Sequence, residues 1–223
     1  MEIKNPRTRG VSATTETPLK MESTMIRNIW AVGRNYADHA KELGNQVPQA
    51  AGDPMIFLKA GSSICHDEEF RLPTFSKDVH FETELVSKFG PNLDFPEFTL
   101  GIDLTARDLQ DKAKSAGHPW TLAKSFKDAC LLGELKPITN GLDLQSLAFS
   151  LKVNGEQRQT GNTKHMIHSI EKIRLYVLER FPVVPGDVVM TGTPAGVGQL
   201  KAGDHLEAEI PGVLKATWRA AAR

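Results

Sequence analysis

Three acidic side chains in the first half of the chain have the types and spacing needed to share one metal ion. Glu82 and Glu84 lie two residues apart in the run HFETE, and Asp103 follows in the run GIDLT. An extended segment turns alternate side chains to one face, so the two glutamates can point together. Three carboxylates without a cysteine suit a hard divalent cation such as Mg2+ or Mn2+ and leave coordination positions for water and substrate. For the E-x-E spacing alone, two solvated strand glutamates would be the preferred interpretation.

The residues that follow Asp103 favour a functional site over that interpretation. The run TARDLQ has the character of a helix start. Thr105 and Asp108 resemble a capping pair, and Gly117 is a plausible end of the helix. The sequence therefore predicts a helix that begins close to a candidate metal ligand.

Arg107 and Gln110 are candidate contacts for a substrate carboxylate. They lie three residues apart, on one face of the predicted helix and close to where Asp103 leaves its strand. A guanidinium group can give a carboxylate a two-pronged contact. The alternative is a surface salt bridge from Arg107 to Asp108 or Asp111.

His39 and Glu42 form a candidate pair for moving a proton. They lie three apart on a helix predicted over residues 35–43, so one helical face presents both. Glu42 could orient the imidazole and raise its basicity, and His39 could then take a proton from water. From the spacing alone, an exposed polar pair is the more common outcome.

Lys124 is a candidate for neutralising negative charge that develops on a substrate oxygen. A lone lysine more often lies on the surface and caps a helix end, but Trp120 and Phe126 flank this one. Those neighbours predict that the lysine is partly enclosed, where its charge has a larger effect.

The motifs together resemble the fumarylacetoacetate hydrolase family. The resemblance is carried by residues 101–110 (GIDLTARDLQ), 119–126 (PWTLAKSF), 32–39 (VGRNYADH) and 190–198 (MTGTPAGVG), and it spans about residues 26–218. It is strongest to the small members that act on acylpyruvates and oxaloacetate. The resemblance implies a mixed β-sandwich roll and commonly a homodimer. It also implies that the His39–Glu42 pair is catalytic on a mobile lid and that Lys124 assists at the substrate oxygen.

Two further residues are candidate substrate contacts. Thr193 lies in a glycine-rich turn after a predicted strand, so its hydroxyl or backbone N–H could meet the substrate carboxylate. Arg34 is a weaker candidate for the same anion. The turn lacks the G-K-[ST] ending of a phosphate-binding loop.

Composition excludes several classes of partner. The 223 residues carry 27 basic and 27 acidic side chains, so no net charge favours nucleic acid or an anionic membrane, and no apolar stretch approaches the length of a membrane span. Cys65 and Cys130 form no metal or redox motif, which indicates two packed thiols in a reducing compartment. We expect a cytoplasmic protein, with residues 1–24 as a flexible leader and residues 25–223 as a single catalytic domain.

The pattern along the chain predicts a β-rich α+β fold. Short strands are expected at 26–32, 54–59, 79–86, 147–153, 157–160 and 188–191, with a hairpin at Asn154-Gly155 and an amphipathic helix within 164–181. Residues 87–99 are expected to be a loop or turn. This connection is shorter than the resemblance implies, which predicts a different pocket rim.

The sequence leads to a hypothesis of Mg2+-dependent cleavage of small 2-keto acids. The C1 carboxylate and C2 oxygen of such a substrate would chelate the ion, with Mn2+ as the possible substitute. Acylpyruvate hydrolysis or oxaloacetate decarboxylation would then proceed through a pyruvate enolate stabilised by the metal. A second hypothesis keeps the site but makes the reaction an isomerisation or tautomerisation, which needs no attacking water. A third, a non-catalytic scaffold, is disfavoured by the complete set of candidate residues.

Overall fold

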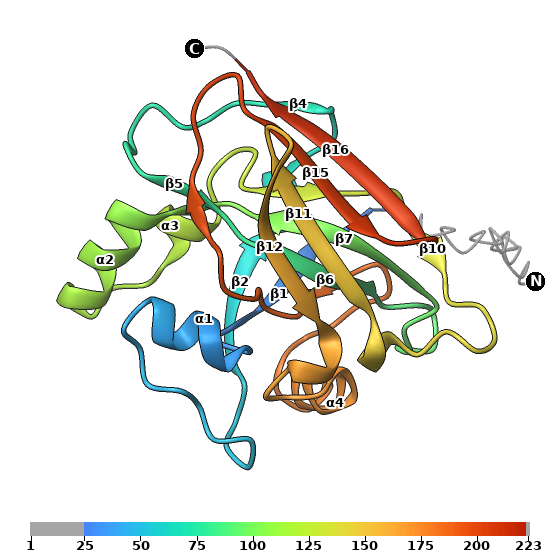
Figure 1. Ribbon diagram of the computed structural model, residues 1–223. Helices are drawn as coiled ribbons and strands as arrows, with labels where there is room; N and C mark the ends of the chain where they lie inside the picture. The colour runs from blue at the N-terminus through green and yellow to red at the C-terminus, as the bar shows by residue number, and fades with distance from the viewer. Residues whose placement is uncertain (1–24, 222–223) are drawn as a thin grey trace, which may run out of the picture.

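The computed structural model describes residues 25–221, so the predicted leader at residues 1–24 lies outside the described residues. Mixed sheets and a few short helices make up the fold, which confirms the β-rich α+β prediction (Figure 1). None of the helices within residues 25–221 is both long and apolar enough to cross a membrane.

An eight-stranded sheet carries two of the three predicted metal ligands, Glu84 and Asp103. Its strands are β1 (Asn28–Gly33), β2 (Met55–Ala60), β3 (Ile64–Cys65), β6 (Thr83–Lys88), β7 (Glu97–Asp103), β9 (Cys130–Leu132), β10 (Lys136–Pro137) and β13 (Val188–Met190). The strand order is β2-β1-β13-β6-β7-β9-β3, with β10 also paired to β7. Pairs β1–β13 and β3–β9 are parallel and the others are antiparallel, so the sheet is mixed as expected.

Two smaller sheets complete the β structure. The five-stranded sheet, in the order β12-β11-β15-β16-β4, comprises β4 (Glu69–Phe70), β11 (Ala148–Val153), β12 (Glu156–Asn162), β15 (His205–Ile210) and β16 (Leu214–Ala220). The three-stranded sheet comprises β5 (Val79–Phe81), β8 (Thr105–Ala106) and β14 (Gly198–Gln199). The hairpin predicted at Asn154-Gly155 joins β11 to β12, and both residues have the positive φ that such a turn requires.

In the part of the chain that the structure describes, four α-helices accompany the sheets: α1 (Ala37–Glu42), α2 (Arg107–Ala116), α3 (Thr121–Lys124) and α4 (Ile170–Arg180). The same part has 3-10 turns at Gly61–Ser63, Leu144–Ser146 and Thr163–His165. Helix α2 ends at Gly117, whose φ of 67° is the left-handed conformation that favours glycine, so the predicted helix end is confirmed.

The main core lies between the eight-stranded and five-stranded sheets. It brings together fully buried side chains from both, including Leu85 and Leu100 of the first and Leu151 and Leu206 of the second. Figure 1 shows β11, β12, β15 and β16 in front of β6 and β7. Strands β11 and β15 alternate buried and less buried positions, because only one face of their sheet meets this core.

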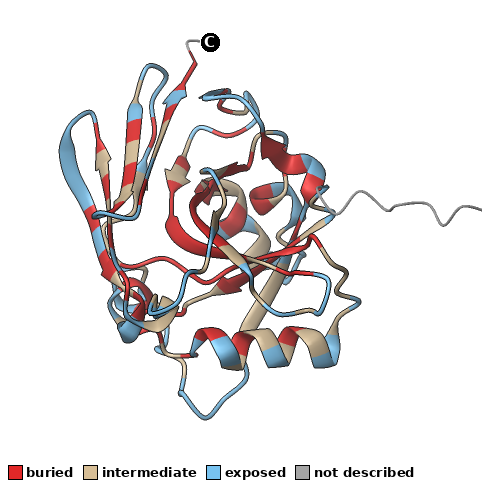
Figure 2. Ribbon diagram, turned by 90° about the vertical axis from the view of Figure 1, so that its right-hand side faces the viewer, coloured by how far each residue is buried: buried red, intermediate tan, exposed pale blue. Residues whose placement is uncertain are grey.

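Helix α4 covers, at β1 and β13, the same face of the eight-stranded sheet that meets the main core. Ile173 and Val177 of the helix pack against Trp30 and Val32 of β1 and Val189 of β13. Buried positions follow one side of α4 and exposed positions the other (Figure 2). Glu84 and Asp103 lie on the other face of this sheet, because Glu84 alternates with Leu85, whose side chain enters the main core.

Several predicted boundaries are wrong, each because tertiary contacts decide the outcome. Residues 89–96 form the predicted loop or turn, but it is shorter than the predicted 87–99, since β6 runs to Lys88 and β7 begins at Glu97. The capping pair at the start of α2 is absent: Asp108 accepts a hydrogen bond from the Ser76 hydroxyl at 2.6 Å, while Thr105 faces the site. These partners lie far away in the sequence, so a pattern of neighbouring residues cannot predict them.

Asp187 is a buried carboxylate that ties β1 to the turn before β13. It accepts hydrogen bonds from the backbone and side-chain nitrogens of Asn28, from Trp30 Nε1 at 3.1 Å and from the backbone N–H of Val184. Asp187→Ala leaves these donors without an acceptor, so we expect the free energy of unfolding to fall by about 3 kcal/mol. Urea denaturation tests this, with Asp111→Ala as a surface control expected to stay within about 0.5 kcal/mol. A loss at Asp187 no larger than that of the control would contradict the bridging role.

Candidate active site

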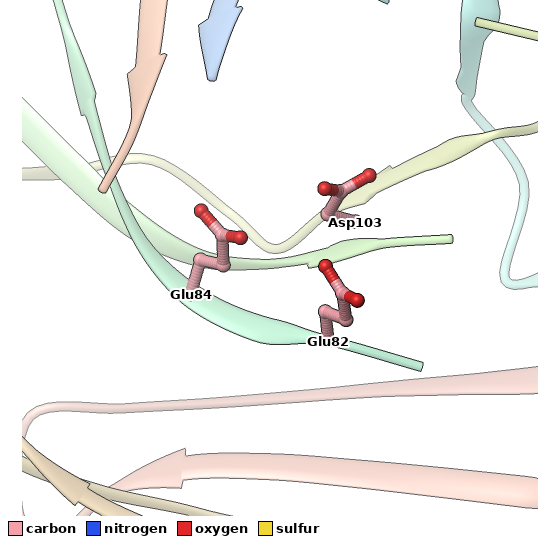
Figure 3. Close-up of side chains that lie close together, drawn as sticks. All are labelled: Glu82, Glu84 and Asp103. Atoms are coloured by element: carbon pink, nitrogen blue, oxygen red, sulfur yellow. The ribbon is translucent and has the colours of Figure 1, made fainter. Parts of the chain in front are cut away.

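The three predicted metal ligands meet where two antiparallel strands end. Glu82 lies in the break between β5 and β6, Glu84 is on β6, and Asp103 is the last residue of β7. The backbone N–H of Asp103 donates to the carbonyl of Glu82 at 2.8 Å, which aligns the ends of the two segments. One oxygen from each carboxylate lies within 4.8 Å of the others, and all three residues are buried. The three side chains stand on the same side of their strands (Figure 3).

The prediction of one continuous metal-bearing strand at 79–86 needs correction. β5 pairs with β8 and β14, whereas β6 pairs with β7 and β13, so the chain changes sheet at Glu82. The alternation that turns Glu82 and Glu84 to one side survives this change. Glu84 therefore belongs to the eight-stranded sheet, whereas Glu82 lies in the break between the two sheets.

The negative charge of the acids is offset by three buried cations. Lys124 Nζ donates to Glu82 at 2.9 Å and to Asp103 at 2.5 Å, Lys59 Nζ donates to Asp103 at 2.5 Å, and Arg107 pairs with Glu82. Charges this deeply buried require such partners. The prediction that Lys124 is enclosed is confirmed, since it is 2% exposed.

The donor set fits a divalent cation. Three close carboxylate oxygens match the preference of Mg2+ and Mn2+ for hard oxygen ligands, and Glu82, Glu84 and Asp103 are the residues that would hold the ion. Glu84 accepts its hydrogen bond from the backbone N–H of Gly192 at 2.6 Å, so it is positioned without using a cationic side chain. An entering cation would therefore meet one carboxylate that has no buried lysine or arginine attached.

The two glutamates differ in acidity. Burial raises the pKa of Glu84 well above its ordinary value, and the charges of Asp103 and Glu82 raise it further. Burial alone would raise the pKa of Glu82 too, but Lys124 and Arg107 outweigh that effect and hold it well below its ordinary value. The Glu84 carboxyl is thus the group of the triad that carries a proton most readily.

This difference predicts that metal binding displaces a proton. A carboxylate must be ionised to ligate, so Mn2+ binding near pH 7 is expected to release up to about one proton per ion, and affinity should rise with pH. Titration calorimetry in buffers of different ionisation enthalpy measures the proton count. A binding enthalpy independent of the buffer would contradict the raised pKa of Glu84.

The His39–Glu42 pair lies on α1 at the rim of the same site. His39 Nδ1 is 3.5 Å from a Glu42 carboxylate oxygen, and the histidine is buried although the pair was expected from spacing alone to be exposed. The carboxylate of Glu42 also accepts from the backbone N–H of Gly196 at 3.0 Å, which fixes it against the glycine-rich turn. Burial lowers the pKa of His39. The charge of Glu82 raises this pKa in part, and the charge of Arg107 lowers it further. The imidazole is therefore held neutral, the form that can accept a proton.

Arg107 and Gln110 lie together as predicted, but with other partners. Arg107 donates to the amide oxygen of Gln110 at 2.7 Å and pairs with Glu82, in place of the surface bridge to Asp108 or Asp111. Both side chains line the cavity in front of the metal ligands. A substrate carboxylate could be bound there by the guanidinium group.

One cavity gathers most of the predicted residues. Its lining includes Arg34, His39, Glu82, Glu84, Arg107, Gln110, Lys124 and Thr193. Glu42 and Asp103 contact this set from behind, through His39 and Lys124. Within residues 25–221, the lining includes no residue of the connection 89–96, so the short connection does not shape this rim.

Thr193 is placed as expected, but its hydroxyl is already engaged. The hydroxyl donates to the backbone carbonyl of Thr83 at 2.9 Å and accepts from the side-chain amide of Gln159 at 2.8 Å. The hydroxyl and the backbone N–H of Thr193 were both expected as possible substrate contacts, and the backbone N–H is the one that stays a candidate.

Lys59, Phe57 and Gln159 are site residues that the sequence interpretation missed. Lys59 is fully buried, and the Phe57 ring lies 4.8 Å from Lys124 Nζ in a cation–π contact. The signal for Lys59 is weak: it shares a strand face with Phe57, but a lysine ending an apolar strand usually marks the surface. Gln159 gave no signal, because its role depends on contacts between sheets.

This fold and this acidic cavity define a class of protein, and the chain belongs to the fumarylacetoacetate hydrolase family. The family model described as fumarylacetoacetate (FAA) hydrolase C-terminal matches residues 28–219. Members of this family are enzymes that act on keto acids, and the resemblance inferred from the sequence motifs is thereby confirmed.

Among characterised relatives, the chain is similar to oxaloacetate tautomerases. It is 39% identical to the mitochondrial oxaloacetate tautomerase FAHD1 of Homo sapiens, over 86% of this chain and 91% of that protein. It is 38% identical to the oxaloacetate tautomerase YcgM of Escherichia coli K12, over 84% and 90%.

The fold is also similar to that of a relative whose structure was solved with a metal ion and a keto acid. The fumarylpyruvate hydrolase of Pseudomonas aeruginosa in complex with Mn2+ and pyruvate superimposes with a TM-score of 0.82 at 30% identity, covering 89% of this chain and 91% of that chain. A relative with the same fold therefore binds a divalent metal and a small 2-keto acid.

Proposed function

We propose that this protein catalyses the keto–enol tautomerisation of oxaloacetate, with Mg2+ or Mn2+ held by Glu82, Glu84 and Asp103. The observation that carries the proposal is a neutral histidine, His39, lining the same cavity as the acid triad. The similarity to two oxaloacetate tautomerases supports this reaction over the cleavage reactions expected first.

The proton transfer follows from the placement of His39. With Nδ1 directed at the Glu42 carboxylate, Nε2 is the nitrogen that can face a substrate. In the keto-to-enol direction Nε2 takes a proton from C3, the C3–H electron pair forms the C2–C3 double bond, and the C2 oxygen gains negative charge. Protonation of that oxygen completes the enol, and the reverse sequence regenerates the keto acid.

The charge on the C2 oxygen is stabilised by groups that are already in place. Burial would lower the pKa of Lys124, but Asp103 and Glu82 raise it above its ordinary value, so this lysine stays charged. A bound divalent cation supplies further positive charge and orients the 2-keto acid. Because Lys124 is buried, its charge acts at a lower dielectric than it would in water.

Acylpyruvate hydrolysis or oxaloacetate decarboxylation is the second candidate function. The similarity to fumarylpyruvate hydrolase supports this candidate. Both reactions would pass through the enolate of pyruvate. Hydrolysis would need a water nucleophile that His39 activates, whereas decarboxylation would release CO2 without a nucleophile. Breaking the bond beyond C3 would release pyruvate in either case.

Product analysis on one enzyme sample separates the candidates. The ultraviolet absorbance of the enol follows tautomerisation of oxaloacetate, while coupled lactate dehydrogenase reports pyruvate from oxaloacetate or acetylpyruvate. We expect tautomerisation to exceed pyruvate release from either compound by at least about a hundredfold. Faster pyruvate release than enol conversion would assign the protein to the second candidate.

A homodimer and a cytoplasmic location remain predictions. Light scattering coupled to size-exclusion chromatography gives the molar mass of the assembly, and a 24.5 kDa species would contradict the dimer.

A further inference from the structure

Gln159 reaches into the site from a different sheet. It lies on β12, the edge strand of the five-stranded sheet, yet its side chain is 1% exposed. Its amide oxygen accepts from the backbone N–H of Thr83 at 3.0 Å, and its amide nitrogen donates to the Thr193 hydroxyl at 2.8 Å and to the carbonyl of Pro194 at 2.9 Å. All of the hydrogen bonds made by this amide therefore end on segments that line or carry the site.

These bonds close a ring around the residue between two metal ligands. Thr83 N–H donates to Gln159, Gln159 donates to the Thr193 hydroxyl, and that hydroxyl donates back to the carbonyl of Thr83. Thr83 separates Glu82 from Glu84 at the point where the chain changes sheet. Here the backbone of Thr83 is fixed by side chains, so the directions of both neighbouring glutamates depend on the ring.

The local structure of β12 is built to aim Gln159 inward. The pairing with β11 shifts register so that Leu151 opposes Gln159 while Lys152 opposes Gln157, and Arg158 is the extra residue of a β-bulge. A bulge redirects the neighbouring side chain. The side chain of Gln157 donates to the backbone carbonyls of Leu151 and Gln159, which stabilises the bulge from outside the site.

We propose that Gln159 is a positioning residue that holds Glu82 and Glu84 in the geometry for binding the divalent cation. The inference rests on the metal site of the proposed function but not on the identity of the reaction. Gln159 touches no reacting atom; it acts through the backbone of Thr83. Residues that orient ligands in this way typically change metal affinity by about 10- to 100-fold.

Mn2+ binding by calorimetry tests the inference with a matched pair of variants. Gln159→Met keeps the side-chain length but removes the ring. Gln145→Met is the control, because the half-buried amide of Gln145 bonds the backbone of Thr163 and Ile170, outside the site. We expect Gln159→Met to weaken Mn2+ binding at least tenfold and Gln145→Met to leave it within twofold. A purely structural role would lower the melting temperature of both variants without separating their affinities. Gln159→Met that binds Mn2+ within twofold of the wild type would overturn the proposal.

Additional measurements distinguish a failure of the Gln159 proposal from a failure of the proposed reaction or of the metal site. If Gln159→Met does not fold, Thr193→Val opens the same ring, and a folded Thr193→Val with unchanged Mn2+ affinity overturns the proposal equally. Wild-type protein that binds Mn2+ but does not turn over oxaloacetate would remove the proposed reaction and leave the Gln159 result valid. Wild-type protein that binds no Mn2+ would overturn the metal site and this inference together.

Discussion

Asp103→Asn is expected to remove metal binding and turnover together. Asp103 is fully buried at the end of β7, and it accepts from both Lys59 and Lys124 at 2.5 Å. Asparagine keeps the shape of the side chain but removes the negative charge that the cation needs. The ammonium groups of Lys59 and Lys124 then lose the carboxylate that they share. We expect Mn2+ affinity to fall at least about a hundredfold and kcat/KM to fall about 10^3-fold or more, since metal binding and charge stabilisation are lost at once.

The effect must be specific to this carboxylate. Asp143→Asn, at an exposed position that caps a 3-10 turn, is the same chemical change outside the site and should alter neither quantity. Calorimetry with Mn2+ and steady-state rates with oxaloacetate measure both variants. Full activity of Asp103→Asn at Mn2+ concentrations that do not saturate the wild type would show that Asp103 is no ligand.

His39→Asn is expected to abolish most proton transfer while leaving the metal site intact. The imidazole lines the cavity but lies on α1, on a different element from the triad, so Mn2+ affinity should change less than threefold. Losing a positioned base should lower kcat by about 10^2- to 10^4-fold. His165→Asn, at an exposed position, is the matched control and should retain wild-type activity. Equal loss of metal binding in His39→Asn would mean that the histidine is a structural part of the metal site.

The pH profile should report the environment of His39. Because burial lowers its pKa, the histidine stays neutral in mildly acidic solution, so the acid limb of kcat/KM should lie below the ordinary histidine value of about 6.5. Glu42 raises the pKa of His39, so Glu42→Gln should move the acid limb to still lower pH while reducing kcat at every pH. A limb that moves upward in Glu42→Gln would contradict this electrostatic assignment.

The sequence predicted the residue types of the site better than their arrangement. The E-x-E spacing correctly placed Glu82 and Glu84 on one side, because alternation is a local property of extended chain. It could not show that the chain changes sheet at Glu82, since this change depends on β8, β13 and β14, which are remote in sequence. For the same reason the ring formed by Gln159 was invisible.

Burial was the other quantity that local patterns could not supply. The spacing of His39 and Glu42 favoured an exposed pair, and only the docking of α1 against Gly196 turns the histidine inward. Lys59 is a second case of the same kind, because a lysine at a strand end normally marks the surface. Its buried position depends on Asp103, which lies 44 residues further along the chain.

The central claim is that this cavity enolises a small 2-keto acid with a divalent metal. The most direct test is the initial rate of enol-to-keto conversion of oxaloacetate by the wild-type protein with Mg2+, after chelation, and after Mg2+ or Mn2+ is restored. The account predicts conversion well above the uncatalysed rate with metal, loss to the uncatalysed rate on chelation, and recovery with either ion. An undiminished rate in the chelated protein would contradict it.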